Sequence, residues 1–552
     1  MNNRTGTHVM PPLVGLLLCV VVGVGGWLRF TGLAERGLLF FDEGVFVSAA
    51  RFMRGLSLQV AHHGWASAHA YVATSAQWSG VPSPYARPMH DFFLMLAMLV
   101  GGPGIPSALQ AMAVAGMLTM AGVYWLGRRL FDPWVGLMGA AVSAISCYQL
   151  AYARSALGET DAMLWFLLAV GGLVWPGIEG RSPAWRRLLL SGGCGAMAFL
   201  SSYRLWIVPV CLCLVEALRA RAGTSTARRA LFRRCALCLL GLLAPVLLWI
   251  VADGYLMHDI AYPATPYLPQ LLFQYGKNMA EGFSPAGWWA YPYIFRSLDG
   301  WFLSIAYLAG MIVWLRQPGW VGQALAGISL VVVLVFSVLH TYHARYISIV
   351  LPFLALGAGY ALVRGTRWCL TRAGMTRLEP LALTVVMLAT LCWCLPSAVA
   401  ATRLRTGYHH VPAALESLAP GDRSAVITTQ PFVLRVIDGR TYLPPPAGEA
   451  ALRTRLAQGV RFFVLDYQLA FGGFDIASTR LAQRLGGTLS PVVILDNPAG
   501  AAPQVLFEHV TDPALTRRWL ADPSMRVLLG LIAIYDLRQL PGVTPAAVPQ
   551  AP

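Results

Sequence analysis

Charged residues are scarce in this sequence. Only 12% of its 552 residues are charged and 57% are hydrophobic, whereas about a quarter of the residues in soluble domains are charged. The composition therefore excludes an ordinary soluble domain and predicts a membrane protein with many spans. Lysine is almost absent, since Lys277 is the single one. The net charge of +16 comes from arginine, which cytoplasmic loops of membrane proteins collect, so we predict no nucleic-acid partner.

The cysteines follow no disulfide or zinc pattern. All ten, from Cys19 to Cys394, lie within or at the edges of apolar segments, and none falls in the polar last quarter. This distribution excludes a disulfide scaffold and a thiolate zinc site. The last quarter also lacks a glycine-rich phosphate loop, an HExxH motif and a GxSxG motif, so we predict no chemistry of its own there.

Long apolar runs predict the membrane spans. The first run, 11–30, lacks the small-residue cleavage site of a signal peptide, so we expect it to remain as a span. Segment 88–102 is apolar but short, and we expect it to lie in the membrane interface. Further spans are predicted at 106–127, 133–151, 161–176, 188–202, 205–218, 235–252, 297–315, 319–339, 346–363 and 380–400. The sequence thus predicts about eleven crossings.

Arginine-rich loops predict the orientation. They fall at alternate ends of successive spans, at 128–133, 181–187, 219–234, 316–318 and 364–377. Because cytoplasmic loops are rich in arginine, we place these loops and the N-terminus inside. An odd number of spans then puts everything after Ala400 outside. We expect a multi-pass protein of the cell membrane, either a bacterial inner membrane or a plasma membrane.

The segment 403–552 has a different character from the rest. Strand-like runs at 424–430, 462–467, 492–496 and 531–537 alternate with helix-like runs at 449–458 and 477–485. Such alternation predicts a small α/β domain. The expected organisation is therefore a polytopic α-helical membrane domain, 1–402, followed by an extracytoplasmic α/β domain, 403–552.

Polar residues gather on the predicted outer side of the membrane domain. They are Asp42, Glu43, Arg87, His90, Arg154, Glu159, Asp161, Arg204, His343, Arg345 and Tyr346. An ionisable group inside a membrane costs about 2–3 kcal/mol at a helix centre on insertion scales, so this gathering points to a function. Any single member could instead pair with a neighbour or a lipid head group.

Arginines and carboxylates at an outer membrane face suit a sugar carried on a lipid phosphate. Arginine binds phosphate oxygens through two parallel hydrogen bonds and neutralises a phosphate leaving group. A carboxylate beside the sugar can take the proton from an acceptor hydroxyl as a general base.

The order of the motifs resembles the GT-C superfamily of membrane glycosyltransferases. Phe41, Asp42 and Glu43 follow the first span, Arg87 and Pro88 precede the second, and an R-x4-E motif runs from Arg154 to Glu159. The motif H-x-R-Y at 343–346 is followed by LPFLAL at 351–356. Over residues 10–400 the chain looks like the protein O-mannosyltransferase-like group that includes the lipid A aminoarabinose transferases, glycosyltransferase families 39 and 83.

The resemblance implies a polyprenyl-phosphate sugar donor, transfer at the outer face and inversion of the anomeric centre. It places Asp42 as the catalytic carboxylate, with Glu43 and Glu159 as further catalytic candidates. It implies that Arg345, Tyr346, Arg87 and Arg154 bind the donor phosphate. Glu159 stands where relatives more often have Asp, so Asp161 competes for its role, and Met89 replaces the second proline of a K-P-P segment. His343, His90 and Arg204 are possible further site residues.

The acceptor implied by the resemblance is a lipid, a glycan or a protein, as in cell-envelope or protein glycosylation. No cofactor is required by the sequence, although a divalent metal held by Asp42 and Glu159 is possible. His62, His63, His69 and His90 could also hold a metal, because imidazole suits zinc and copper, but their spacing matches no metal motif.

Two other functions remain open from the sequence. A transporter or flippase for a lipid-linked sugar would explain the apolar spans, but it is expected to carry acids in mid-span and internal repeats. An oligosaccharide ligase or polymerase with a diphosphate-linked donor shares the outer face and the need for arginine. The identity of the donor lipid distinguishes the ligase or polymerase from a glycosyltransferase that uses a polyprenyl-phosphate sugar.

Reporter fusions test the predicted orientation. A reporter fused after Ala400 should be exported, and one fused within 219–234 should stay in the cytoplasm, because the arginine-rich loops fix the inside. Reporter activity in intact cells measures both. Finding the two reporters on one side of the membrane would overturn the span count.

Overall fold

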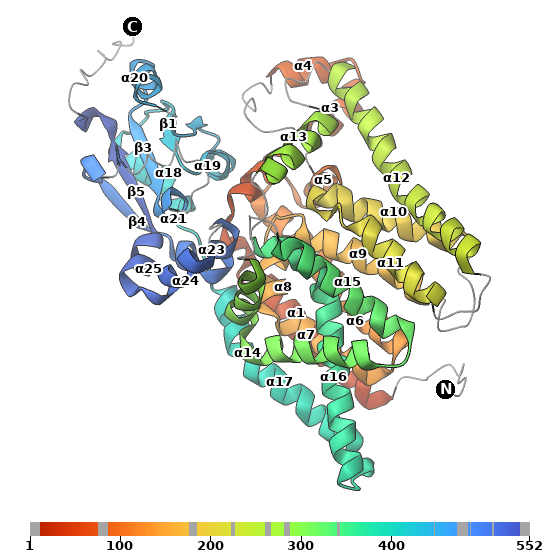
Figure 1. Ribbon diagram of the computed structural model, residues 1–552. Helices are drawn as coiled ribbons and strands as arrows, with labels where there is room; N and C mark the ends of the chain where they lie inside the picture. Colours follow the sequence, from red (N-terminus) through yellow and green to blue (C-terminus); the bar gives the residue numbers. More distant parts are fainter. Residues whose placement is uncertain are drawn as a thin grey trace.

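The computed structural model describes residues 11–74, 87–175, 185–221, 227–259, 266–280, 287–338, 343–446, 448–471, 484–485, 487–509 and 513–540. A bundle of helices makes up most of the chain, and a smaller unit with a β-sheet lies against one end of it (Figure 1). Most of the predicted helix 477–485 lies outside the described residues, as does part of the basic loop 219–234.

The main helices of the bundle follow the predicted apolar runs. They are α1 (Pro12–Phe30), α6 (Ile105–Leu130), α7 (Pro133–Ile145), α8 (Cys147–Ala153), α9 (Glu159–Val174), α10 (Trp185–Ser201), α11 (Val208–Arg221), α12 (Ala227–Asp259), α14 (Gly287–Arg316), α15 (Trp320–Ser337), α16 (Leu351–Arg372) and α17 (Glu379–Thr402). Among the described residues, seven helical segments are long and apolar enough to cross a membrane, or eight if the pair α7 and α8, bent by 66°, forms one span.

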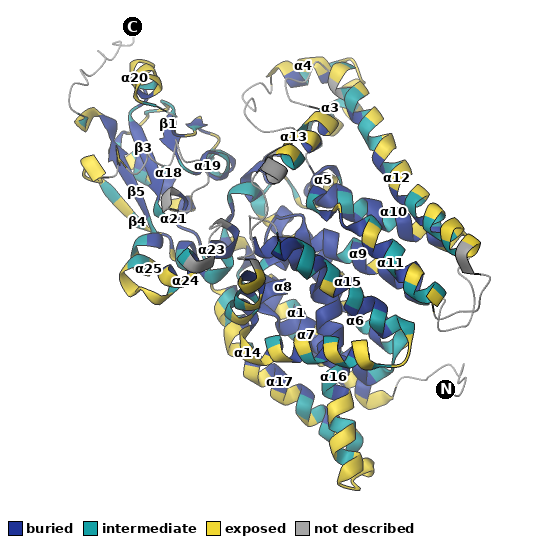
Figure 2. Cartoon of the chain, in the orientation of Figure 1, coloured by how far each residue is buried: buried dark blue, intermediate teal, exposed yellow. Residues whose placement is uncertain are grey.

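The remaining predicted spans coincide with shorter helices. Predicted spans 161–176, 188–202 and 205–218 correspond to α9, α10 and α11, which have 16, 17 and 14 residues. A multi-pass membrane protein is therefore supported, whereas the count of eleven stays a prediction. Exposed apolar side chains line the outer faces of α12, α14 and α17, as the yellow bands of Figure 2 show. Leu248, Ile305 and Trp393 are examples, with 70%, 61% and 75% of their surface exposed.

Further helices and two 3-10 turns join the bundle helices at the end nearest the sheet. They are α2 (Leu33–Arg36), α3 (Phe41–His63), α4 (Ser67–Thr74), α5 (Pro88–Gly101), α13 (Tyr267–Ala280) and two 3-10 turns, η3 (Tyr203–Leu205) and η4 (Ala344–Val350). Helix α5 has the length and apolar character predicted for an interfacial segment. All the acidic and basic residues predicted for the site stand on or beside these further helices and turns, or at the ends of α8 and α9.

Segment 403–540 contains a five-stranded sheet in the order β2-β1-β3-β5-β4. The strands are β1 (Val426–Thr428), β2 (Tyr442–Leu443), β3 (Phe462–Asp466), β4 (Val493–Asp496) and β5 (Leu531–Asp536). Strands β1, β2 and β3 are parallel, and β5 runs antiparallel to both β3 and β4. All four predicted strand runs contain a strand, and the short β2 was not predicted.

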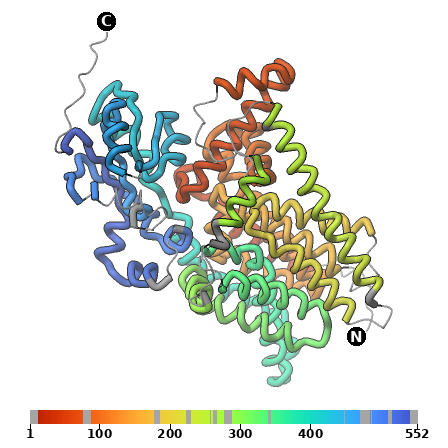
Figure 3. Tube along the Cα trace, turned by 45° about the horizontal axis from the view of Figure 1, so that its top comes forward, coloured from red at the N-terminus to blue at the C-terminus, as the bar shows by residue number. Residues whose placement is uncertain are grey.

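Seven helices accompany the sheet in the described part of this segment, and some of them contact the bundle. They are α18 (Val411–Leu418), α19 (Pro431–Asp438), α20 (Glu449–Ala457), α21 (Tyr467–Phe471), α23 (Pro503–His509), α24 (Pro513–Ala521) and α25 (Pro523–Leu529), with 3-10 turns at Tyr408–His410, Pro498–Ala501 and Leu537–Gln539. Helix α23 reaches the bundle beside η4 and α14, and α19 lies against α3 (Figures 1 and 3). The sheet unit therefore meets the same end of the bundle that carries the predicted site.

Close packing fixes the contact between α3 and α19. A Cβ atom on Gly44 would lie 2.5 Å from the backbone of Phe432 and Val433, so only glycine allows the two helices this approach. Gly44 directly follows Asp42 and Glu43 in the sequence. The first turn of α3 is thus held between the bundle and the sheet unit.

Candidate active site

The neighbouring acids Asp42 and Glu43 occupy the first turn of α3 but face different surroundings. Glu43 is completely buried. Its carboxylate accepts hydrogen bonds from the backbone N–H groups of Leu39 (2.5 Å), Phe40 (2.9 Å) and Ala156 (2.6 Å), and from Arg36 Nη1 at 2.9 Å. A glutamate at the third helical position commonly satisfies free N–H groups at a helix start in this way. Glu43 therefore shapes the loop, and its oxygens are already engaged.

Asp42 is the accessible acid of the pair. About a quarter of its side chain is exposed, and its Oδ2 lies 2.5 Å from Arg345 Nη1. Burial by itself would raise the pKa of Asp42, but the nearby positive charges of Arg345, Arg87 and Arg204 hold it below its usual value. Asp42 is therefore a carboxylate at neutral pH, open to solvent on one side and paired with arginine on the other.

Arg345 has a second acidic partner, Glu508, which the sequence did not indicate. The Arg345 Nε atom lies 3.1 Å from Glu508 Oε2, and the Arg345 main-chain N–H donates to Glu508 Oε1 at 2.8 Å. The Tyr152 hydroxyl donates to the same oxygen. Glu508 stands on α23 and is 2% exposed. In the sequence it is one acid in a short amphipathic run, with nothing to separate it from a surface residue.

Glu159 is the third acid of the cluster and interacts with two other arginines. It starts α9, and its Oε1 lies 3.1 Å from Arg87 Nη1 and 3.9 Å from Arg204 Nη1. The guanidinium carbon of Arg204 lies 5.2 Å from the ring centres of both Tyr203 and Tyr346. These cation–π contacts hold Arg204 between two aromatic faces. Arg204, 13% exposed, is the most accessible of the three arginines.

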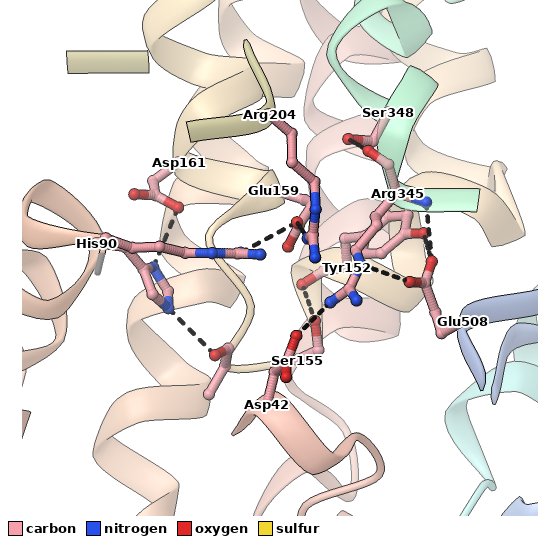
Figure 4. A network of polar contacts seen from close by, with 12 residues as sticks. Asp42, His90, Tyr152, Ser155, Glu159, Asp161, Arg204, Arg345, Ser348 and Glu508 are labelled. Carbon is pink, nitrogen blue, oxygen red and sulfur yellow. Dashed lines mark hydrogen bonds and ion pairs between the residues drawn. The ribbon is translucent and has the colours of Figure 1, made fainter. Parts of the chain in front are cut away.

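The structure therefore brings three carboxylates and three guanidinium groups together (Figure 4). We call Asp42, Glu159, Glu508, Arg87, Arg204 and Arg345 the charged cluster. Its members come from six elements spread from α3 to α23. Opposite charges balance within the cluster, which offsets the high cost of removing each charge from water.

His90 and Asp161 form a separate pair beside the cluster. His90 Nδ1 lies 3.2 Å from Asp161 Oδ1, and His90 Nε2 lies 3.1 Å from the Ala156 carbonyl oxygen. Both side chains are buried. Asp161 thus binds His90 while Glu159 contacts the arginines, so the two competing acids have different partners. His343 is also buried, and its ring packs edge-on against Tyr346 at 5.1 Å between centres.

Arg154, a predicted phosphate ligand, is engaged elsewhere. Its guanidinium donates to the carbonyl oxygens of Leu28 (2.8 Å), Arg29 (3.1 Å), Thr31 (2.9 Å) and Thr402 (3.0 Å). These carbonyls belong to the ends of α1 and α17, where the last turn of a helix leaves them without partners and slightly negative. Arg154 therefore joins two helix ends and contacts none of the charged cluster.

The residues considered for a metal do not form a metal site. Within the described ranges, no group of three or more His, Cys, Asp or Glu side chains is arranged to hold an ion. Asp42 and Glu159 are each paired with arginine. His62, His63 and His69 lie exposed on α3 and α4, away from these acids.

Part of the chain matches a known protein family. Residues 82–249 match the family model for dolichyl-phosphate-mannose-protein mannosyltransferase. This segment includes Arg87, Arg154, Glu159 and Arg204. No curated protein sequence matches the chain.

Solved structures share the fold at low sequence identity. ArnT from Cupriavidus metallidurans, bound to undecaprenyl phosphate, matches with a TM-score of 0.58 and 14% identity over 88% of this chain and 96% of that one. The archaeal oligosaccharyltransferase AglB from Archaeoglobus fulgidus, in complex with an inhibitory peptide and a dolichol-phosphate, matches with a TM-score of 0.54 and 12% identity over 85% and 72%. The shared fold and the family match confirm the resemblance to the GT-C superfamily. The matched family consists of glycosyltransferases, which identifies the chain as a glycosyltransferase.

Replacing Glu43 tests its structural role. Glu43→Gln should lower the free energy of unfolding by about 1–3 kcal/mol, because the new amide group would point N–H toward buried N–H donors. Thermal unfolding of the purified protein in detergent measures the change. Glu449→Gln, at an acid whose side chain is 68% exposed, is the control and should have no effect. If Glu43→Gln has the free energy of unfolding of the wild type but no turnover, Glu43 is catalytic and not structural.

Proposed function

We propose that the protein transfers a sugar from a polyprenyl-phosphate donor to a lipid, glycan or protein acceptor at the outer face of the membrane, with inversion. The observation that carries this proposal is the position of Asp42. It is the only carboxylate of the charged cluster with a substantially exposed side chain, and it lies against the arginine that the resemblance assigns to phosphate. A base and a phosphate ligand are thus adjacent, and the base is partly exposed.

Arg345 and Arg204 are the proposed ligands of the donor phosphate. Arg345 lies beside Asp42, and Arg204 is partly exposed and stacked on Tyr346. Their positive charge would stabilise the phosphate as it leaves, and exclusion of water strengthens this effect. Arg87 reinforces the positive field from its place beside Glu159, and Arg154 holds the helix ends that frame the site.

Asp42 is the proposed general base. The acceptor hydroxyl oxygen forms a bond to the anomeric carbon while the bond from that carbon to the phosphate oxygen breaks. The hydroxyl proton passes to Asp42, and the phosphate leaves on its lipid. A single displacement of this kind inverts the anomeric centre.

The related structures support a lipid phosphate as the donor group. ArnT was solved with undecaprenyl phosphate and AglB with a dolichol-phosphate. The site residues of this chain stand at helix ends and on short connecting elements, at the end of the bundle that meets the sheet unit. A transporter or flippase would instead be expected to carry such charges in mid-span. The proposal places this end outside, together with an α/β domain of 403–552.

The donor lipid that accumulates without the enzyme tests the proposed function. Deleting the gene should cause a polyprenyl monophosphate carrying one sugar to accumulate, because its consumer is lost. Mass spectrometry of the extracted lipids identifies it. Accumulation of a diphosphate-linked oligosaccharide would favour the ligase or polymerase alternative.

Substituting Asp42 tests the general base. Asp42→Asn keeps the shape of the side chain but removes the basic oxygen, so turnover should fall by about 100- to 10,000-fold with folding intact. The matched control is Asp132→Asn, because Asp132 is also about a quarter exposed and paired with an arginine, Arg367, at 2.7 Å. Transfer from the accumulated donor by the purified variants measures both rates. Normal turnover in Asp42→Asn would remove the central residue of this mechanism.

A further inference from the structure

Glu508 occupies a group of donors that would suit a phosphate. Its carboxylate accepts two hydrogen bonds, from the main-chain N–H of Arg345 and the hydroxyl of Tyr152, and forms an ion pair with Arg345 Nε. Figure 4 shows Glu508 reaching from the sheet unit to the Arg345 side chain, with Asp42 on the other side of the guanidinium group. Backbone N–H, arginine and hydroxyl donors are the groups that proteins use for phosphate oxygens. The carboxylate therefore stands where a phosphate on Arg345 would have to be held.

Charge balance makes joint occupation unfavourable. The charged cluster has three carboxylates for its three arginines, so an added phosphate leaves at least one negative charge uncompensated in a buried site. Neutralising one carboxylate would restore the balance. Asp42 and Glu159 each have the positive field of Arg345, Arg87 and Arg204 around them, whereas Glu508 has its ion pair with Arg345 and the field of Arg204.

Few other groups around Glu508 could balance the negative charge of an added phosphate. The titratable groups that face it or stand on elements packed against α23 are Arg345 and Tyr346 on η4, Tyr148 and Tyr152 on α8, Glu159 on α9, Arg204 on η3, Tyr291, Tyr293, Arg296, Asp299, Tyr307 and Arg316 on α14, Tyr467 on α21, and Arg517 and Arg518 on α24. Glu159 is the nearby acid and opposes a second negative charge.

We propose that Glu508 is the resident anion of the donor-phosphate site, and that phosphate binding requires a proton on Glu508, which releases Arg345 to the phosphate. This inference rests on the proposed function, because it takes Arg345 as the phosphate ligand. It assigns to the C-terminal segment a direct part in donor binding. Donor affinity then depends on pH through a residue that takes no part in the sugar transfer itself.

The protonation of Glu508 falls in the accessible range. Burial raises the pKa of Glu508 to about 7, although the charge of Arg345 opposes this rise. Below that value the carboxyl is neutral and the site is ready for phosphate. Above it the carboxylate must first take up a proton, so the dissociation constant should increase by about tenfold per pH unit.

Binding of a nonreactive phosphodiester tests the proposal. A short-chain polyprenyl methyl phosphate is a suitable probe, because the diester keeps one negative charge across the range and carries no sugar. Its dissociation constant is measured with the full chain in detergent from about pH 5.5 to 8.5, a range centred on the pKa of Glu508. Wild type should bind equally below about pH 6 and about tenfold more weakly at pH 8. Glu508→Gln should bind with one affinity throughout, tighter than wild type at pH 8.

The matched control is Asp466→Asn. Asp466 is also buried, its pKa is also raised by burial, to about 6, and it also accepts a tyrosine hydroxyl, from Tyr408. Because Asp466 has no contact with Arg345 among its hydrogen bonds, this variant should keep the wild-type pH dependence.

Two further measurements distinguish a failure of the Glu508 inference from a failure of the proposed function. Arg345→Ala should weaken probe binding at every pH, and unchanged binding would overturn the phosphate role of Arg345 and with it the proposed function. If Arg345→Ala binds weakly but Glu508→Gln keeps the wild-type pH dependence, the Glu508 inference alone is wrong. If Glu508→Gln does not fold, calorimetry of the wild type in buffers of different ionisation enthalpy decides. Uptake of about one proton per bound probe at pH 8 supports the inference, and no uptake overturns it.

Discussion

The ion pair between Asp42 and Arg345 is the interaction on which the site depends. It joins two residues 303 positions apart, one at the start of α3 and the other on η4. Burying the charge of Arg345 requires acidic partners, and Asp42 is one of the two that it has. Glu508 extends the pair to the C-terminal segment, and Arg204, Arg87 and Glu159 extend it to the remaining helices. The cluster therefore links bundle and sheet unit while it presents one carboxylate to solvent.

Residues adjacent in the sequence serve different purposes in the site. Asp42 and Glu43 are neighbours, yet one faces the opening and the other closes the helix start with four hydrogen bonds. Arg154 begins the motif that ends at Glu159, yet it contacts only the ends of α1 and α17. Glu43 and Arg154 thus hold backbone around the site, whereas Asp42 and Glu159 belong to the charged cluster. Such support keeps a reactive geometry in place when substrate enters.

The sheet unit has a closer relation to the site than its sequence indicates. It carries no catalytic motif, but it contributes the carboxylate that engages Arg345, and α19 packs tightly on the first turn of α3. Any movement of this unit relative to the bundle would change both contacts at once. The charged cluster and the C-terminal segment are therefore physically connected through Arg345.

The sequence by itself determined the membrane character, the positions of the main helices, four of the five strands, the resemblance to GT-C enzymes and the candidates Asp42, Glu159, Arg87 and Arg345. These follow from local hydrophobicity and from short motifs, which are readable along the chain. Tertiary structure alone decided that Glu43 and Arg154 hold backbone, that Asp161 binds His90, and that Glu508 belongs to the site. The physical reason is that the role of a charged side chain depends on its partners and its burial, and these are set by elements hundreds of residues away in the sequence.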